Sequence, residues 1–213
     1  TSSEMINKIK ENKYIKKTLK SYDNESILKV ISSDKKYLEG LFFPDSYYFY
    51  KNTSDIEILQ NSHSVLNRKL QSAWDNRSAE LPYKDMYEAL IIASIIEKEV
   101  GVAEEASIIA GVFVNRINIG MPLQSDPTVI YGMGNKFNGN LRRKDLKKDT
   151  PYNTYTRKGL PPSPISLPSL NSIEAALNPA VTSALYFVAK GNRKHHFSAT
   201  LKEHNRAVRK YQK

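Results

Sequence analysis

The sequence of 213 residues contains no cysteine, which excludes disulfide bridges and thiolate metal sites. It also contains no apolar run of the roughly 18 residues or more that cross a bilayer, so no membrane-spanning helix is predicted within it. Acidic residues are few, because 22 of them stand against 32 lysines and arginines, and the formal net charge is +10. What is present is a normal apolar fraction of 40%, enough for the core of one large domain or two small ones.

The excess positive charge is concentrated in three segments. Residues 1–36 hold nine lysines against five acidic residues, residues 142–158 hold seven basic against two acidic, and residues 190–213 hold eight against one. Such segments suit an anionic polymer or surface. Nucleic acid, acidic phospholipid, an anionic cell-wall polymer and simple solubility all stay open on charge alone. The nucleic-acid interpretation has no recognised motif behind it, and most aromatic residues lie away from the basic segments.

The chain is organised around residues 87–99. Asp85 and Glu88 have the spacing of a capping box, so we expect a helix to begin near Met86. Its leucine and isoleucines leave no polar stripe, which is typical of a helix buried on most sides. Gly101 predicts where the helix stops.

Two carboxylates, Glu97 and Glu99, stand at the end of this apolar helix. Only Ala93 and Ser94 lie one turn before Glu97 on its face, so little bulk covers it. Partial desolvation would raise its pKa and let it hold and donate a proton near neutrality. The alternative is that both glutamates form the solvated end of a core helix. Glu99 points roughly 200° away from Glu97 on a helix, so the two cannot project equally into one cleft.

Several other helices are predicted from their start and stop signals. Ser54 and Glu57 form a capping box before a long amphipathic pattern. A second apolar helix, with Glu105 in its first turn, is expected to end at Gly120 and to pack on the central one as a hairpin. Further helices are expected from the N-caps Asn171 and Thr200.

The fold class predicted from these elements is α+β, with small antiparallel strands and a long ordered loop around a cleft. The strands are expected in the aromatic segment 37–50 and as a hairpin formed by residues 184–189 and 195–199. Residues 121–170 form the longest stretch predicted as irregular. Its aromatic side chains lie among short amides and hydroxyls, a mixture that suits sugar binding, although a well-packed loop without special chemistry stays open.

No metal site is predicted. His195, His196 and His204 fit no standard zinc spacing, and no cluster of acidic ligands accompanies them.

A series of segments occurs in an order that carries a family resemblance. They are Leu-Glu-Gly-Leu-Phe-Phe-Pro-Asp-Ser-Tyr (38–47), Ala-Ser-Ile-Ile-Glu-Lys-Glu (93–99), Leu-Gln-Ser-Asp-Pro-Thr-Val-Ile-Tyr-Gly (123–132), Tyr-Asn-Thr-Tyr (152–155), Gly-Leu-Pro-Pro-Ser-Pro-Ile (159–165), Leu-Tyr-Phe-Val-Ala (185–189) and His-Phe-Ser-Ala-Thr with His204 and Asn205 following (196–205). Together they resemble the YceG-like endolytic murein transglycosylases of bacteria. The resemblance covers roughly residues 37–211.

The resemblance implies a domain organisation and a location. Residues 37–213 would be the catalytic YceG-like domain, and residues 1–36 a connector or the tail of a truncated LysM-like module. The family is anchored by one helix in the cytoplasmic (inner) membrane, with its catalytic domain facing the periplasm or outer surface. Because the sequence starts at Thr1 without a methionine, we expect such a segment upstream of it.

The resemblance also implies an activity without a cofactor. The family cleaves peptidoglycan glycan strands internally, between N-acetylmuramic acid and N-acetylglucosamine, leaves 1,6-anhydro-muramic acid ends, and is thought to terminate nascent strands. The implied partners are glycan strands and cell-wall synthases, not nucleic acid. The alternative is a catalytically silent peptidoglycan-binding scaffold of the same fold, against which the retained glutamate argues.

The family's catalytic glutamate falls on the first glutamate of the 93–99 segment, Glu97, with Glu99 as its nearest rival. It would protonate the glycosidic oxygen and then, as carboxylate, take the proton from the muramic acid 6-hydroxyl that attacks C1. The candidates for binding the sugars or stabilising oxocarbenium-like charge are Gln124, Ser125, Asp126, Asn153 and Tyr155.

Overall fold

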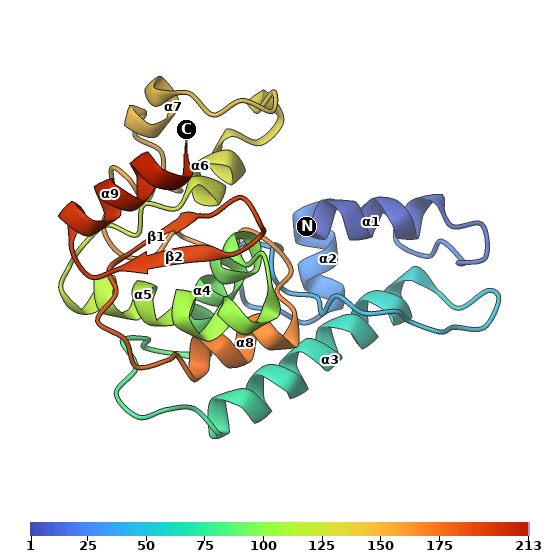
Figure 1. Cartoon of the computed structure of the whole chain (residues 1–213). Helices are drawn as coiled ribbons and strands as arrows, with labels where there is room; N and C mark the ends of the chain where they lie inside the picture. The colour runs from blue at the N-terminus through green and yellow to red at the C-terminus, as the bar shows by residue number, and fades with distance from the viewer. Residues whose placement is uncertain (213) are drawn as a thin grey trace.

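The computed structural model describes residues 1–212, which form a set of helices and one small two-stranded sheet (Figure 1). The α-helices are α1 (Ser2–Glu11), α2 (Asn24–Val30), α3 (Asp55–Asp75), α4 (Met86–Glu99), α5 (Ala106–Asn118), α6 (Asp126–Met133), α7 (Arg143–Lys147), α8 (Leu170–Leu177) and α9 (Leu201–Tyr211), with 3-10 turns η1 (Ala103–Glu105) and η2 (Gly134–Lys136). The strands are β1 (Tyr186–Ala189) and β2 (His195–Ser198). The predicted α+β class is confirmed.

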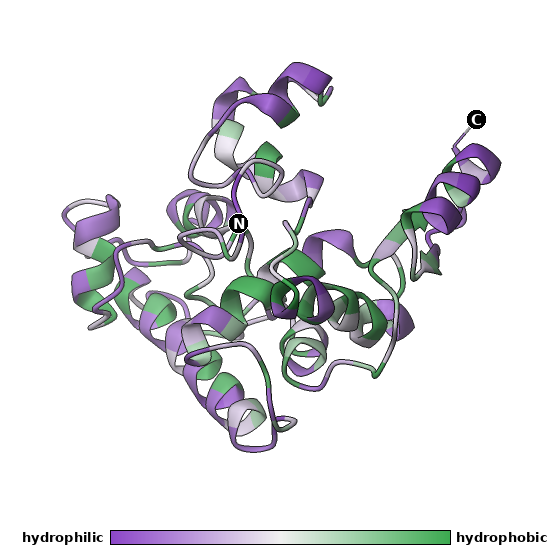
Figure 2. Cartoon of the chain, turned by 90° about the vertical axis from the view of Figure 1, so that its left-hand side faces the viewer, coloured by the Kyte–Doolittle hydropathy of each residue, from purple (hydrophilic) through white to green (hydrophobic). Residues whose placement is uncertain are grey.

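Helix α4 is the centre of the core. The Asp85 side chain accepts the backbone N–H of Glu88 and caps the helix at the predicted residue. All residues from 89 to 96 are buried, and α5 and α8 pack against them. Burial of each of its isoleucines contributes roughly 1.5–3 kcal/mol relative to an exposed side chain. Figure 2 shows the hydrophobic residues gathered on the inner helices and the hydrophilic ones on their outer faces.

The one polar residue inside this stretch of α4, Ser94, fastens the chain that precedes α8. Its hydroxyl donates to the Ile91 carbonyl at 2.7 Å and accepts the backbone N–H of Ile165 at 2.9 Å. The Ser166 hydroxyl donates to the carbonyl of Ser94 at 2.9 Å. A buried serine is tolerated here because both of its hydrogen-bonding roles are used.

The first 36 residues pack on the rest of the molecule. Side chains of α1 and α2 share one hydrophobic cluster with those of α3, α4 and α8. Buried Asp55, at the start of α3, accepts hydrogen bonds from the Thr18 backbone and hydroxyl at 2.9 and 2.6 Å, and from the Tyr22 hydroxyl. The predicted boundary at residue 36 stays a prediction, although the two sides of it share this core.

The sheet is a single antiparallel hairpin. Tyr186 pairs with Ser198 and Ala189 with His195, and this confirms the predicted strand pair. The prediction of strands in residues 37–50 is wrong, since no strand lies there within the described chain. Leu41, Phe42 and Phe43 are instead buried in the helical core, so their side chains pack irregularly and no strand ladder forms.

Two other expectations are corrected. Residues 121–170 are not irregular throughout, because α6 and α7 lie within them. Helix α8 is capped by Ser169, two residues before the predicted Asn171, and the Ser169 side chain accepts from Ser172 N. The capping box at Ser54 and the N-cap at Thr200 are confirmed.

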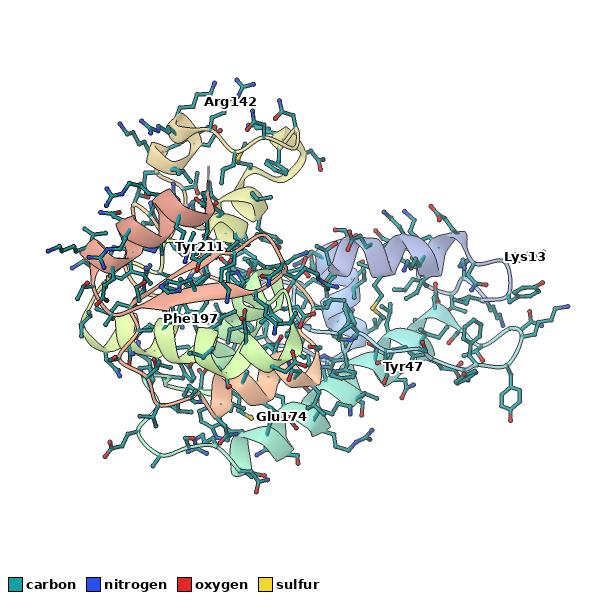
Figure 3. The ribbon with its side chains drawn as sticks, in the orientation of Figure 1. Lys13, Tyr47, Arg142, Glu174, Phe197 and Tyr211 are labelled. Carbon is teal, nitrogen blue, oxygen red and sulfur yellow. The ribbon has the colours of Figure 1, made fainter. Side chains whose placement is uncertain are left out.

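The loop that follows α1 and the region of α7 lie at opposite ends of the molecule (Figure 3). Figure 3 shows Lys13, beyond α1, at the opposite end from Arg142, beside α7. Within residues 1–212, no helix combines the length and the apolar character that crossing a membrane requires.

Candidate active site

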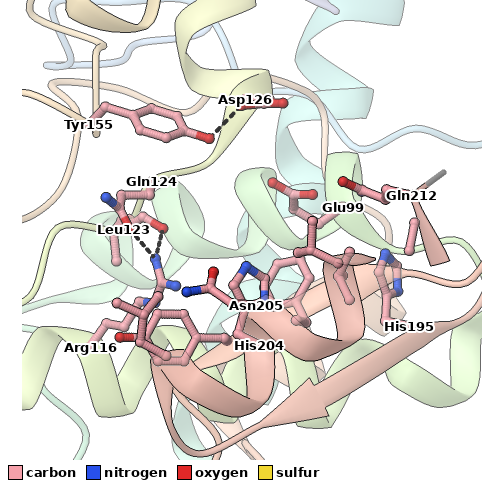
Figure 4. Close-up of a pocket in the computed structure, with 16 residues that line it drawn as sticks. Glu99, Arg116, Leu123, Gln124, Asp126, Tyr155, His195, His204, Asn205 and Gln212 are labelled. Atoms are coloured by element: carbon pink, nitrogen blue, oxygen red, sulfur yellow. Dashed lines mark hydrogen bonds between the residues drawn. The ribbon is translucent and has the colours of Figure 1, made fainter. Parts of the chain in front are cut away.

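A cleft of about 540 Å³ opens between the end of α4, the start of α6, the hairpin and α9 (Figure 4). Polar side chains dominate its walls: Glu99, Arg116, Gln124, Asp126, Tyr155, Tyr186, His195, His204, Asn205 and Gln212. Its apolar lining comes mainly from the hairpin and α9. The cleft thus offers a concave surface with several convergent polar groups, the usual form of a small-molecule or polymer site.

Glu99 is the acidic residue best placed for proton transfer in this cleft. Its Oε1 accepts the Ser125 hydroxyl at 2.6 Å, which fixes the carboxyl group in place. Burial raises the pKa of Glu99, and the charge of Asp126 raises it further, while the Ser125 hydrogen bond, His195 and Arg116 lower it by less. Glu99 is therefore suited to hold a proton at a pH where an ordinary glutamate has lost it.

Glu97 faces elsewhere and is not among the residues that line the cleft. Its Oε2 accepts the Ser169 backbone N–H at 2.9 Å, the Ser169 hydroxyl at 2.7 Å and the Ser172 hydroxyl at 2.6 Å. These donors belong to the N-terminus of α8, where a negative charge is stabilised. The expectation that Glu97 opens into the cleft is corrected: the 100° turn per residue directs Glu97 to α8 and Glu99 to the cleft.

Three of the five predicted binding residues line the cleft, and a fourth lies directly behind it. Gln124 and Asp126 line it directly, and so does Tyr155, whose hydroxyl donates to Asp126 Oδ1 at 2.5 Å. Ser125 is buried behind them and reaches Glu99, so it positions the acid. Gln124 adopts a positive φ of 52°, a strained conformation for a residue other than glycine.

Asn153, the fifth, is fully buried and lies outside the cleft lining. Its amide nitrogen donates to the carbonyls of Asp145, Leu146 and Lys148, and its oxygen accepts the Tyr155 N–H at 2.8 Å. This amide has no group left for a sugar. Asn153 instead binds the end of α7 to the segment that carries Tyr155.

Arg116 was not among the residues that the sequence predicted for the site. Arg116 is 6% exposed, and its guanidinium donates to the carbonyls of Leu185 at 2.6 Å, Leu123 at 2.7 Å and Pro122 at 3.2 Å. It thereby joins the segment before α6 to the start of β1. The only sequence signal was its place one helical turn after buried Val112.

Two aromatic rings continue the wall on the α9 side. Tyr186 lies over the Arg116 guanidinium at 5.3 Å, and His204 stacks on Tyr186 at 5.1 Å. Burial lowers the pKa of His204, and the nearby Arg116 lowers it further. Its Nδ1 is buried and has no hydrogen-bond partner among residues 1–212. His204 and Asn205 belong to the resembling segments, which was the available signal.

The hairpin is locked to the turn that follows Glu99. His195 Nδ1 lies 2.8 Å from Glu105 Oε2, and the His195 backbone N–H also donates to that carboxylate. A Cβ on Gly101 would come within 2.1 Å of the Arg193 carbonyl, so only glycine fits this contact. The contacts with Glu105 and Gly101 thus fix the position of His195 in the cleft that Glu99 also lines.

Within the described residues, no group of three or more histidines and acidic residues is placed to hold a metal.

With this geometry in view, the comparisons with known proteins decide the family. The profile of the YceG-like family matches residues 1–210. The chain belongs to the YceG-like family. A relative of this family from Bacillus subtilis (strain 168), named endolytic murein transglycosylase, is 36% identical over 99% of the chain and 58% of its own length.

Other YceG-like relatives agree. A protein of Streptococcus pneumoniae (strain D39) with the same name is 31% identical over 98% of the chain and 39% of its own length. The crystal structure of a YceG-like protein from Listeria monocytogenes, 31% identical, superposes with a TM-score of 0.71 over 97% of this chain and 67% of that one. The chain thus spans about two fifths to three fifths of the curated relatives.

Proposed function

We propose that this YceG-like chain is the catalytic part of an endolytic lytic transglycosylase. It would cleave the bond between N-acetylmuramic acid and N-acetylglucosamine within peptidoglycan strands and leave 1,6-anhydro-muramic acid ends. The single observation that carries the proposal is Glu99, a desolvated carboxyl held by Ser125 at the base of a cleft. The relatives named endolytic murein transglycosylase supply the substrate class and the reaction class.

We assign the general acid–base role to Glu99 and not to Glu97. A general acid must reach the leaving oxygen, and Glu99 lines the cleft whereas Glu97 binds the start of α8. An acid must also be protonated before the reaction, and burial of Glu99 favours its neutral form. The role of Glu97 becomes structural in this proposal.

One carboxyl suffices for the chemistry. Protonated Glu99 gives its proton to the glycosidic oxygen, the C1–O bond breaks, and N-acetylglucosamine leaves with a free 4-hydroxyl. Glu99, now a carboxylate, takes the proton of the muramic acid 6-hydroxyl, whose oxygen bonds to C1 and closes the 1,6-anhydro ring. No water is consumed, and the tethered nucleophile needs no separate binding site. Glu99 ends protonated, ready for the next bond.

The other cleft residues have roles that follow from their positions. The Asp126 carboxylate, held by the Tyr155 hydroxyl, faces the space where positive charge develops on the sugar ring and would stabilise it. His204 and Gln124 line the cleft and would meet sugar hydroxyls and N-acetyl groups, and the apolar faces of the hairpin suit sugar C–H groups.

The deciding experiment reads the chemistry of the new chain ends. Uncrosslinked glycan strands are incubated with the wild-type chain, Glu99→Gln and Glu97→Gln, and the ends are identified by mass spectrometry. Anhydro ends from the wild type and Glu97→Gln but not from Glu99→Gln would support the proposal. Reducing ends, heavier by one water, would show a hydrolase. Strands that bind and stay intact would indicate the silent scaffold.

We also propose that the whole protein works at the cytoplasmic membrane, beside cell-wall synthases, with this domain on the outer side. The family resemblance supports this placement, and the anchoring segment would lie outside the 213 residues. Fractionation of cells that express the complete gene, with protease applied to intact spheroplasts, tests it. Recovery of the domain in the protease-protected cytosol would refute it.

A further inference from the structure

The end of the molecule farthest from the α7 region carries a group of exposed tyrosines and lysines that the cleft does not use. We name it the lysine–tyrosine tip and define it as residues 12–20 and 44–53. It holds five lysines, four tyrosines and one phenylalanine against a single acidic residue, Asp45. Figure 3 shows Lys13 at this end and Tyr47 nearer the body.

The tip is a built structure and not a pair of loose loops. The Lys16 N–H donates to the Thr53 carbonyl at 2.9 Å, and the Asn52 N–H donates to the Tyr14 carbonyl at 2.8 Å. Ile15 is buried beneath them and anchors the first loop to the core. The two loops therefore present their side chains from one framework, with no ordering required on binding.

Its aromatic side chains point into solvent. Tyr48 is 99% exposed, Tyr50 is 90% exposed and Tyr14 is 50% exposed. Large exposed apolar groups clustered in this way mark an interaction surface and not a fold requirement. Tyr47 does serve the fold, since its hydroxyl donates to the Phe43 carbonyl at 2.8 Å.

The tip's lysines are available for a partner. Lys13, Lys16, Lys20 and Lys51 are exposed, and none forms an ion pair with another described residue. Lys17 donates to the Asn12 carbonyl at 2.7 Å and holds the loop. The partner should therefore be anionic.

We propose that the lysine–tyrosine tip binds the surface of an anionic phospholipid bilayer. The amphipathic tyrosine ring, apolar along its body and polar at its hydroxyl, suits the headgroup level, and the lysines suit the negative surface potential. The fully exposed tyrosines project from the end of the protein, and the neighbouring pocket is lined by Pro44, Asp45 and Tyr47 but not by Tyr48 or Tyr50. A protruding group fits a flat surface, whereas a sugar chain needs a groove.

The first test is co-flotation of the chain with vesicles. Binding is expected to vesicles in which roughly a third of the phosphatidylcholine is replaced by phosphatidylglycerol, and to weaken as salt rises. A lysine near such a surface strengthens binding roughly fivefold, so the triple variant Lys13→Gln, Lys16→Gln and Lys51→Gln should bind about 100-fold more weakly. Tyr48→Ser with Tyr50→Ser should weaken binding roughly tenfold.

The matched controls remove the same charge or apolar area elsewhere. Lys144→Gln, Lys147→Gln and Lys148→Gln lower the charge equally at the α7 end, and Ile119→Ser with Val181→Ser removes exposed apolar side chains away from the tip. Both controls should keep wild-type binding, and thermal melts should show every variant folded. Equal loss in the tip and α7 variants would overturn the proposal, because attraction would then depend on net charge alone.

A second measurement reports how deeply the lysine–tyrosine tip inserts into the bilayer. Tyr48→Trp in a Trp74→Phe background places the only tryptophan at the tip. Its emission should shift to the blue and be quenched by brominated lipid on anionic vesicles, and an unshifted emission would refute insertion. Pelleting with purified peptidoglycan separates the rival partner. If the tip variants lose peptidoglycan binding and keep vesicle binding, the surface is a glycan site and the lipid proposal is wrong.

Discussion

Replacement of each glutamate at the end of α4 by glutamine should separate catalysis from stability. Glu97→Gln keeps an oxygen for Ser169 and Ser172 but loses the charge, and three hydrogen bonds to Oε2 become neutral. A charge-assisted hydrogen bond exceeds a neutral one by roughly 0.5–1 kcal/mol, and the helix dipole adds a few tenths. We expect the free energy of unfolding to fall by about 2 kcal/mol and Tm by about 4–8 °C.

Glu99→Gln should have the opposite pattern. Its folded-state pKa lies above the unfolded value, so the stability it contributes is present at low pH and is lost as pH rises through the folded pKa. Glutamine does not ionise, so the variant does not lose stability in this way and should be at least as stable as the wild type at neutral pH. Without a proton to give, its cleavage rate should fall by about 10²–10⁴ or more.

The assay pairs the rate of anhydro-end formation with thermal denaturation of the same samples. Activity is compared well below the Tm of Glu97→Gln, so that unfolding does not imitate a catalytic defect. Glu97→Ala, which removes the acceptor altogether, extends the stability series. A folded Glu97→Gln that is inactive, beside an active Glu99→Gln, would refute the assignment and return the acid–base role to Glu97.

Three further outcomes follow from particular contacts. Asp126→Asn removes a charge that raises the pKa of Glu99, so the alkaline limb of the rate–pH profile should move to lower pH, and a move to higher pH would contradict the account. Asn153→Ala should lower the free energy of unfolding by about 2–4 kcal/mol in denaturant titrations, because it leaves three carbonyls and one N–H without their hydrogen-bond partner. As a control, Gln124→Ala at an exposed position should change the free energy of unfolding by less than about 1 kcal/mol. Burial raises the pKa of Asp55, but hydrogen bonds from Thr18, Tyr22 and Leu19 outweigh burial and hold the pKa at about 2. The Asp55 carboxylate therefore stabilises the fold by about 2 kcal/mol above pH 4, and this stabilisation is lost as pH falls toward 2. In an acid titration of stability, Asp55→Asn should lack this pH dependence.

Helix positions were predictable wherever the signal was local. The caps at Ser54, Asp85 and Thr200 act within four residues of sequence, and the structure confirms all three. The prediction of strands in the aromatic segment 37–50 failed because ring-rich sequences favour strands only when a partner strand is present. Here Phe42 and Phe43 are buried in the helical core, whereas Tyr48 and Tyr50 are exposed. Helix α8 starts earlier than Asn171 because Ser169 is held from outside by Glu97.

Most residue types of the candidate site could be predicted from the sequence, but the directions in which their side chains point could not. The sequence placed two carboxylates at the end of an apolar helix and noted that they point apart, but only the packing of α8 and α9 determines which one meets the cleft. Asn153 shows the same limit, since its value to the loop depends on carbonyls five to eight residues away that happen to converge on it. Arg116 depends on partners up to 69 residues distant, which no local pattern reports.

The walls of the cleft come from segments that lie far apart in the chain, so they are synthesised at different times. Glu99 is synthesised about ninety residues or more before Tyr186, His195 and His204. A nascent chain that has passed α6 already holds its acid but has no opposite wall around it. On the proposed function, cleavage of glycan strands therefore becomes possible only after His204 has been synthesised, and a chain truncated before residue 186 would leave the strands intact.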